Sequence, residues 1–176
     1  MWYASVMDRL DQLLGVTALG VLDRLRAAVG DDSGVSEAEA GALVHIQAWP
    51  GGSVGELAGV VGRSQPAAVR LVDRLVERGL VRRGPGADRR TAALVLTEAG
   101  SRLADAVLAA RARALAPLLG DLSGAEREAL EQLLDRVAAG LAADRTCAVR
   151  ACRLCDRDAC YSGPTCPLEH TTGSFR

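Results

Sequence analysis

Residues 53–96 decide the fold of this chain, and they read SVGELAGVVG RSQPAAVRLV DRLVERGLVR RGPGADRRTA ALVL. The segment contains two short helix patterns separated by a Gly-Arg break. Ser53 stands where the first helix would be capped, with Glu56 three residues later to complete a capping box. Ser64 holds the same place before the second helix, and Pro66 lies in its first turn, where a missing amide donor costs little. These signals predict two helices joined by a tight turn.

The second helix is followed by a stop signal and a hairpin pattern. Gly79 ends the helix, and the apolar runs 80–83 and 92–96 flank a Gly-Pro-Gly loop, which is typical of a β-hairpin. Within the helix, four apolar side chains recur at helical spacing and are expected to face a core: Val69, Val72, Leu75 and Val76. The order helix, turn, helix, hairpin predicts a winged helix-turn-helix in a mainly α chain, with α+β character only from the small wing hairpin.

The charge of this segment indicates a nucleic-acid partner. Residues 53–96 contain eight arginines and four acidic residues, a net charge of +4, whereas the whole chain carries −1, so the remainder carries −5. A basic second helix can enter a major groove with its N-terminal side chains on base edges. Arginines of the wing can reach phosphates or a narrow minor groove. We therefore expect this segment to bind double-stranded DNA.

Four motifs of the segment resemble those of the MarR family of transcriptional regulators. They are ELA at 56–58, SQPAAVRLVDRLVERGLVRR at 64–83, DRR at 88–90 and LTEAG at 96–100. With the flanking helices, the resemblance covers roughly residues 5–143. It implies a two-fold homodimer that binds a palindromic operator, most often as a repressor. It also implies a small-molecule effector, typically a phenolic or apolar acid, in a cleft between the dimerisation helices and the DNA-binding lobe.

The same resemblance identifies candidate DNA-binding residues. At or near the major groove it places Ser64, Gln65, Pro66, Ala67, Ala68, Arg70 and Arg74, with Pro66 limited to an apolar contact. On the wing, Arg89 would enter the minor groove and Asp88 would hold the wing through an ionic contact. Arg90 fits the motif equally well, so the choice between the two arginines stays open.

Amphipathic helix patterns flank the DNA-binding lobe on both sides. They cover about residues 5–29 and 98–143, with a break at 121–124, and Ser36 and Ser123 stand at further helix starts. These helices are too apolar to stand alone in water, so we expect them to bury against a second subunit. This divides the chain into a winged-helix domain, 1–145, whose DNA-binding lobe spans about 36–97, and a cysteine-rich tail, 146–176.

Two features of the remaining sequence bear on location and sensing. No apolar run reaches the length of a membrane span, and the N-terminus carries Asp8 and Asp11 in place of a basic start, so we expect a cytoplasmic protein without membrane contacts. His45 lies inside a helix beside Val44 and Ile46. A single histidine there is more often a packed side chain than a metal ligand or sensor.

The tail holds every cysteine of the protein. Cys152, Cys155, Cys160 and Cys166 follow the spacing C-x2-C-x4-C-x5-C, and Cys147 and His170 are spare candidate ligands. The spacing approximates a zinc knuckle, in which a cation relieves the repulsion between neighbouring thiolates. A Cys-Pro step at the end of the run is also typical of iron–sulfur ligation. Two further hypotheses stay open: a metal-free thiol switch and a disordered tail with incidental cysteines.

These patterns together predict a non-enzymatic regulator. The sequence has no phosphate loop, no Ser/His/Asp grouping and no carboxylate-bearing pocket motif, so a metal or redox enzyme is disfavoured. A protein-interaction adaptor that kept the fold but binds no DNA is the third class. Salt-dependent binding to duplex DNA would separate the regulator from both.

Overall fold

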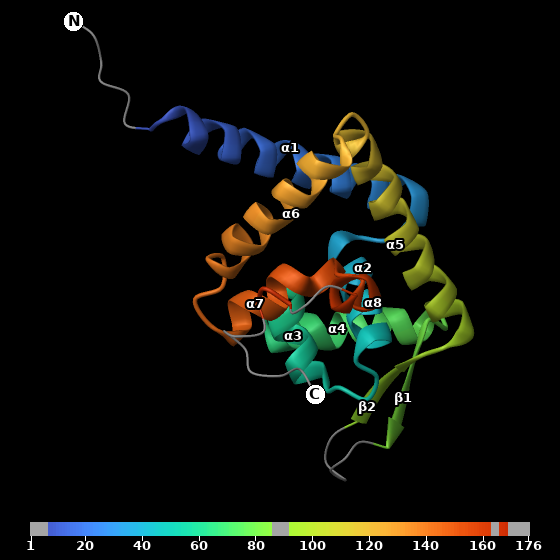
Figure 1. Cartoon of the computed structure of the whole chain (residues 1–176). Coiled ribbons are helices and arrows are strands. Elements are labelled where there is room, and N and C mark those ends of the chain that lie inside the picture. Colours follow the sequence, from blue (N-terminus) through green and yellow to red (C-terminus); the bar gives the residue numbers. More distant parts are fainter. Residues whose placement is uncertain (1–6, 86–91, 163–165, 169–176) are drawn as a thin grey trace, which may run out of the picture.

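The computed structural model describes residues 7–85, 92–162 and 166–168. Figure 1 shows short helices and a small hairpin beneath longer helices, with the tail helices against the short ones. In chain order the elements are α1 (Arg9–Ser33), α2 (Glu37–Ala48), α3 (Val54–Val61), α4 (Gln65–Glu77), β1 (Val81–Pro85), β2 (Ala92–Leu96), α5 (Glu98–Leu119), α6 (Gly124–Ala139), α7 (Arg145–Ala151), the 3-10 turn η1 (Cys152–Leu154) and α8 (Arg157–Tyr161). The expected winged helix-turn-helix is confirmed.

Capping boxes begin three of the helices at the predicted serines. Ser36, Ser53 and Ser123 each accept a hydrogen bond from the backbone N–H three residues later, and the glutamate at that position bonds back to the serine. Ser64 differs, because it has the backbone conformation of a cap but its side chain makes no capping hydrogen bond. A capping oxygen normally accepts a hydrogen bond from one of two backbone amides, and Pro66 lacks one of them. Fewer donors are therefore available to the Ser64 hydroxyl.

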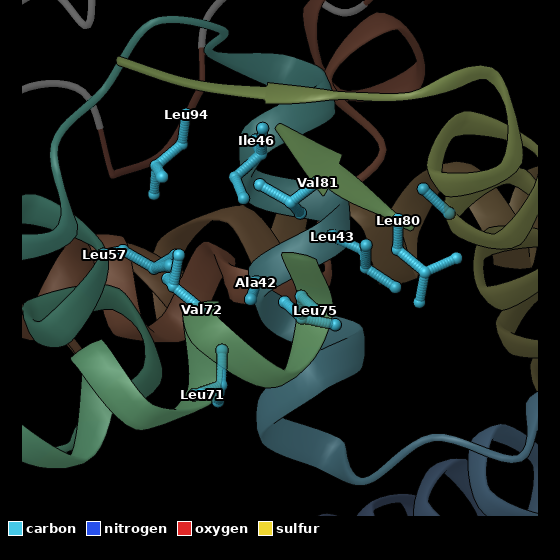
Figure 2. Packing of buried hydrophobic residues seen from close by; sticks show 11 residues of the cluster. Ala42, Leu43, Ile46, Leu57, Leu71, Val72, Leu75, Leu80, Val81 and Leu94 are labelled. Carbon is cyan, nitrogen blue, oxygen red and sulfur yellow. The ribbon is translucent and has the colours of Figure 1, made fainter. Parts of the chain in front are cut away.

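The core of the DNA-binding lobe lies between α2, α3, α4 and the hairpin. Its side chains converge from all of these elements, as Figure 2 shows, and the largest fully buried ones are Leu43, Leu57, Val72, Leu75, Val81 and Leu94. Aliphatic residues alone fill this core, consistent with an aromatic content of only 3%. Each buried side chain of this size stabilises the fold by roughly 1.5–3 kcal/mol relative to its exposed state.

The hairpin is joined to its neighbours by backbone contacts. β1 and β2 are antiparallel, with Val81 opposite Leu96, and Gly79 ends the preceding helix with a φ of 67°. The Thr97 hydroxyl caps α5 and also donates to the carbonyl of Gly79 at 2.7 Å. In the first turn of α5, a Cβ atom on Gly100 would lie 2.0 Å from the carbonyl oxygen of Leu80. Glycine at this position therefore lets α5 pack directly on the entry to the wing.

Two long helices form the upper layer. α1 packs mainly on α5, and α6 folds back from the end of α5 (Figure 1). α6 ends at Ala139, four residues before the expected end at 143, and a turn at Gly140 and Leu141 follows it. None of the described helices combines the length and the hydrophobicity that crossing a bilayer requires.

Candidate nucleic-acid interface and cysteine cluster

The candidate recognition helix α4 has one buried and one exposed face. Ala68, Leu71, Val72 and Leu75 are buried, whereas Ser64, Gln65, Pro66, Val69, Arg70 and Arg74 are exposed. Val69 was expected in the core, but its side chain is 37% exposed. The buried stripe is rotated toward Ala68 and Leu71, because these two positions complete the 3.6-residue period with Val72 and Leu75.

Two of the predicted DNA-contacting alanines differ in accessibility. The Ala68 side chain is completely buried in the lobe, so its methyl group cannot reach a base, and that expectation is wrong. Ala67 is partly exposed and remains a candidate. Gln65 has its amide near α3, since a Cβ atom on Gly55 would lie 3.6 Å from Gln65 Oε1. The accessible start of α4 therefore consists of Ser64, Gln65, Pro66 and Ala67.

The arginines of α4 differ in their ion pairs. Arg70 takes part in none of the ion pairs found within the described residues, whereas Arg74 Nε lies 3.9 Å from Glu39 Oε1 and Arg78 Nη1 lies 3.4 Å from the same atom. Burial opposes ionisation of Glu39, but hydrogen bonds from Ser36 and the charges of Arg78 and Arg74 outweigh it and lower the pKa of Glu39. Among the residues that the structure describes, Arg70 is thus the arginine of α4 without an ion-pair partner.

The wing is linked to α4 by an ion pair that the sequence did not indicate. Arg83 Nη2 on β1 lies 2.6 Å from Asp73 Oδ1 on α4. The predicted wing-tip residues Asp88, Arg89 and Arg90 lie outside the described residues, so their roles stay predictions. The Arg83–Asp73 contact sets the base of the wing relative to the helix that would enter the major groove.

Four tail cysteines come together in space. The thiols of Cys152, Cys155, Cys160 and Cys166 interact with one another in a ring, and Cys166 is only 4% exposed. Cys147 is exposed, in the first turn of α7, and does not join them. His170 lies outside the described residues. The structure thus brings together the same four cysteines that the spacing selected.

The cluster as it stands is a set of interacting thiols. Hydrogen bonding from Cys155 lowers the pKa of Cys152, and the same contact together with burial raises the pKa of Cys155. Burial also raises the pKa of Cys160 and of Cys166. Within the described part of the chain, no three or more His, Cys, Asp or Glu side chains are already arranged to hold a metal ion. Binding one would require deprotonation and a local adjustment of the sulfurs.

The tail is anchored on the DNA-binding lobe through α2. Arg153 Nη2 donates to Glu37 Oε1 at 2.6 Å, and Arg26 Nε of α1 donates to the other oxygen of Glu37 at 2.9 Å. The Arg153 hydrogen bond is the main reason that the pKa of Glu37 is lowered. Further along, Arg157 Nη1 donates to the carbonyl of Ala48 at 3.0 Å. The cysteine cluster is therefore held against the lobe by ionic and backbone contacts.

His45 is a packed side chain, as expected from its neighbours. Its ring lies 4.9 Å from that of Trp49, and burial lowers its pKa from 6.5 to about 4. Both rings line a cavity of about 500 Å³ between α2, α3 and α7. At neutral pH the imidazole is uncharged.

The comparison with known proteins agrees with this geometry. Residues 33–91 match the MarR family. A MarR family protein from Bacillus stearothermophilus is 27% identical, with a TM-score of 0.65 over 73% of this chain and 89% of the other. Wild-type MarR from E. coli in its apo form is 24% identical, with a TM-score of 0.61 over 74% and 98%. A Mycobacterium tuberculosis MarR family protein in complex with salicylic acid is 23% identical, with a TM-score of 0.59 over 75% and 98%.

These matches cover the helix-turn-helix motif in the sequence and about three quarters of the chain in the fold. The family match ends at residue 91 and does not reach the cysteine cluster. The helix-turn-helix segment of this chain thus matches the MarR family, and the fold of about three quarters of the chain is similar to that of MarR-family transcriptional regulators.

Proposed function

We propose that this protein is a repressor that binds a palindromic operator as a homodimer, through α4 in the major groove and the wing in the minor groove. The observation that carries the proposal is the division of α4. One face is buried in the core of the lobe, whereas Gln65 and Arg70 are exposed on the helix, whose start is accessible. Such side chains can bond to base edges, arginine to guanine and glutamine to adenine. Arg89 or Arg90 would occupy the minor groove.

The homodimer is supported by the apolar faces of the upper layer. Large hydrophobic side chains of α1 and of the α6 region are 42–71% exposed in the single chain: Leu10, Leu13, Leu14, Val16, Leu19, Leu133, Leu134, Val137 and Leu141. Exposed apolar surface of this extent is typical of an interface. A second copy related by a two-fold axis would cover both faces and set two α4 helices on successive half-sites.

DNA binding is tested by salt-dependent anisotropy on a duplex that the wild-type protein selects from a random library. Arg70→Ala is expected to relax discrimination at one position of each half-site. Arg89→Ala or Arg90→Ala is expected to weaken binding to all sequences, whichever arginine enters the minor groove. The matched control Arg9→Ala, at the start of α1, removes the same charge. Unchanged affinity and discrimination in all three variants would refute DNA recognition by these elements.

A small-molecule effector is supported by a second cavity. Its volume is about 520 Å³, and it lies between α1, the end of α6 and the tail, with Val21, Leu25, Leu141 and Leu154 among its lining residues. Salicylic acid is bound by the M. tuberculosis relative, and we propose a similar aromatic or apolar acid here. Addition of salicylate should lower the affinity for the selected duplex, and no change over a titration to saturation would exclude this ligand.

We further propose that Cys152, Cys155, Cys160 and Cys166 bind a metal, with zinc favoured. The supporting observation is that four cysteines separated by up to 14 residues meet in one cluster. A four-thiolate zinc site would be structural and would fold the tail. An iron–sulfur cluster is the alternative, and it would make the tail a redox sensor.

Elemental analysis and a visible spectrum of anaerobically purified protein test this part of the proposal. One zinc per chain without colour supports the structural site, and iron with sulfide and a brown chromophore supports the sensor. The double variant Cys152→Ser and Cys155→Ser should lose the metal, whereas Cys147→Ser, the matched control, should retain it. Protein without either metal would leave the thiol switch as the function of the cluster.

A further inference from the structure

An arginine of the tail lies on the turn of the helix-turn-helix. A Cβ atom built on Gly62 would be 2.8 Å from Nε and 2.9 Å from Cζ of Arg150, so the guanidinium rests directly on the backbone of this residue. Gly62 ends α3 with a φ of 62°, and the exposed residues Arg63 and Ser64 lead from it into α4. A segment outside the family match therefore reaches the part of the fold that adjoins the recognition helix.

Arg153 holds Arg150 in this position. Its Nη1 donates to the carbonyl oxygen of Arg150 at 2.8 Å, while its Nη2 donates to Glu37 on α2 at 2.6 Å. Its stem passes over Gly41, where an added Cβ atom would lie 3.5 Å from Arg153 Cβ. One side chain thus ties the end of α7 to α2, and both contacts use the planar, multidentate geometry of a guanidinium.

The charge of Arg150 is available to a ligand. The residue is exposed, and no ion pair found among the described residues includes it. Its position beside Gly62 puts a guanidinium group near the turn that leads into α4. In helix-turn-helix proteins the helix before the recognition helix crosses the phosphate backbone. A cation beside the end of that helix can donate hydrogen bonds to a phosphate oxygen. Most protein–DNA hydrogen bonds go to the phosphate and sugar groups.

We propose that Arg150 is a phosphate-contacting residue which the tail adds to the DNA-binding surface, and that Arg153 is its positioning residue. The proposal rests on the proposed DNA-binding function and extends it to a segment after the dimerisation helices. It assigns the tail a direct part in affinity, without sequence discrimination, because a phosphate contact carries no base information.

The test measures the affinity of the full-length protein for its selected duplex over a series of salt concentrations. Each phosphate contact contributes about 0.9 to the slope of log K against log salt, so loss of two contacts in a dimer lowers the slope by about 1.8. At 0.1 M salt this corresponds to a loss of affinity of about 60-fold for Arg150→Ala. Arg150→Lys should retain most of the slope, and the charge control Arg9→Ala should retain all of it.

Arg153→Ala tests the positioning role. It should reproduce much of the reduction in slope, although its own guanidinium is bonded to Glu37 and to the Arg150 carbonyl. In the double variant, Arg150→Ala should add little to Arg153→Ala, because the two changes remove the same contact. Additive losses would show that Arg153 acts independently, and they would refute its positioning role.

Two outcomes would overturn the proposal while leaving the proposed function intact. One is an Arg150→Ala protein with the slope of the wild type when Arg70→Ala has lost discrimination. The other is tighter binding by Arg150→Ala, which would show that the tail obstructs DNA. A wild-type protein that selects no duplex, by contrast, would refute the proposed function and this inference with it.

Discussion

Replacing Gly100 by alanine tests how closely the wing is coupled to α5. Gly100 lies in the first turn of α5, and the new Cβ atom would be 2.0 Å from the Leu80 oxygen and 3.0 Å from the Leu80 carbonyl carbon. Both atoms belong to backbone, so no side-chain rotation can relieve the overlap. The same oxygen accepts the Thr97 N–H at 3.0 Å and lies 3.3 Å from the Thr97 hydroxyl. Relief of the overlap requires a shift of about 1 Å, which would break both contacts.

The cost follows from these contacts. Overpacking of a buried site costs typically about 1–3 kcal/mol, and each lost hydrogen bond adds about 1 kcal/mol. We expect Gly100→Ala to lower the free energy of unfolding by about 3–5 kcal/mol. Because the displaced backbone joins α4 to β1, the wing should also shift relative to the recognition helix. DNA affinity should therefore fall under conditions in which the variant is still folded.

Urea denaturation followed by circular dichroism measures the effect, at one protein concentration because the stability of a dimer is concentration-dependent. The matched control is Gly59→Ala in α3, where an added Cβ atom has no neighbour within 4 Å. The control should gain about 0.5–1 kcal/mol, since alanine is the better helix former. A Gly100→Ala protein as stable as the wild type would refute the close packing of α5 on the wing entry.

Four further predictions concern the site, the dimer, the cluster and pH. Arg70→Ala should cost about 1–3 kcal/mol of discrimination at a single operator position, which competition between singly substituted duplexes would reveal. Leu134→Glu, at a side chain that is 53% exposed in the single chain, should give a monomer in sedimentation equilibrium, and a persistent dimer would place the interface elsewhere. Removal of the proposed metal with a chelator should make trypsin cleave after Arg150 and Arg153 faster than after Arg9, whereas equal acceleration at all sites would indicate global unfolding. Finally, the pKa of His45 is about 4 in the folded protein, against 6.5 for a freely solvated imidazole, so the unfolded chain binds the proton first as the pH falls. Stability should therefore decrease by about 1–2 kcal/mol between pH 7 and pH 5, and His45→Gln should abolish most of that decrease in denaturation measured at both pH values.

Local chemistry accounts for the parts of the fold that the sequence predicted. Serine and glutamate at a spacing of three identify helix starts because both partners of the capping box belong to one short segment. The helix end at Gly79 and the hairpin could be predicted for the same reason, since their conformation depends on neighbouring residues only. The cluster of four cysteines could be predicted because residues that lie close together in the sequence can adopt only a few arrangements in space.

The failures of prediction arise from contacts between distant segments. Val69 and Ala68 exchange their expected environments because two sets of positions on α4 have helical spacing, and the packing of α4 in the lobe buries the set that contains Ala68. The ion pairs of Arg153 with Glu37 and of Arg83 with Asp73 join residues 116 and 10 positions apart. A sequence with many arginines does not indicate which of them form ion pairs with acidic side chains. The docking of the tail beside Gly62 could not be predicted for the same reason.

The ion pairs of Glu37 determine how a movement of α2 would affect the rest of the molecule. Its two oxygens are held by different segments, one by α1 through Arg26 and the other by the tail through Arg153. A rotation of α2 would turn this carboxylate, which could not then keep both guanidinium partners in their present directions. In the proposed dimer, a change in the spacing of the two lobes would therefore alter the contact between Glu37 and Arg153, which lies next to the cysteine cluster. A single carboxylate thus joins α1, α2 and the tail.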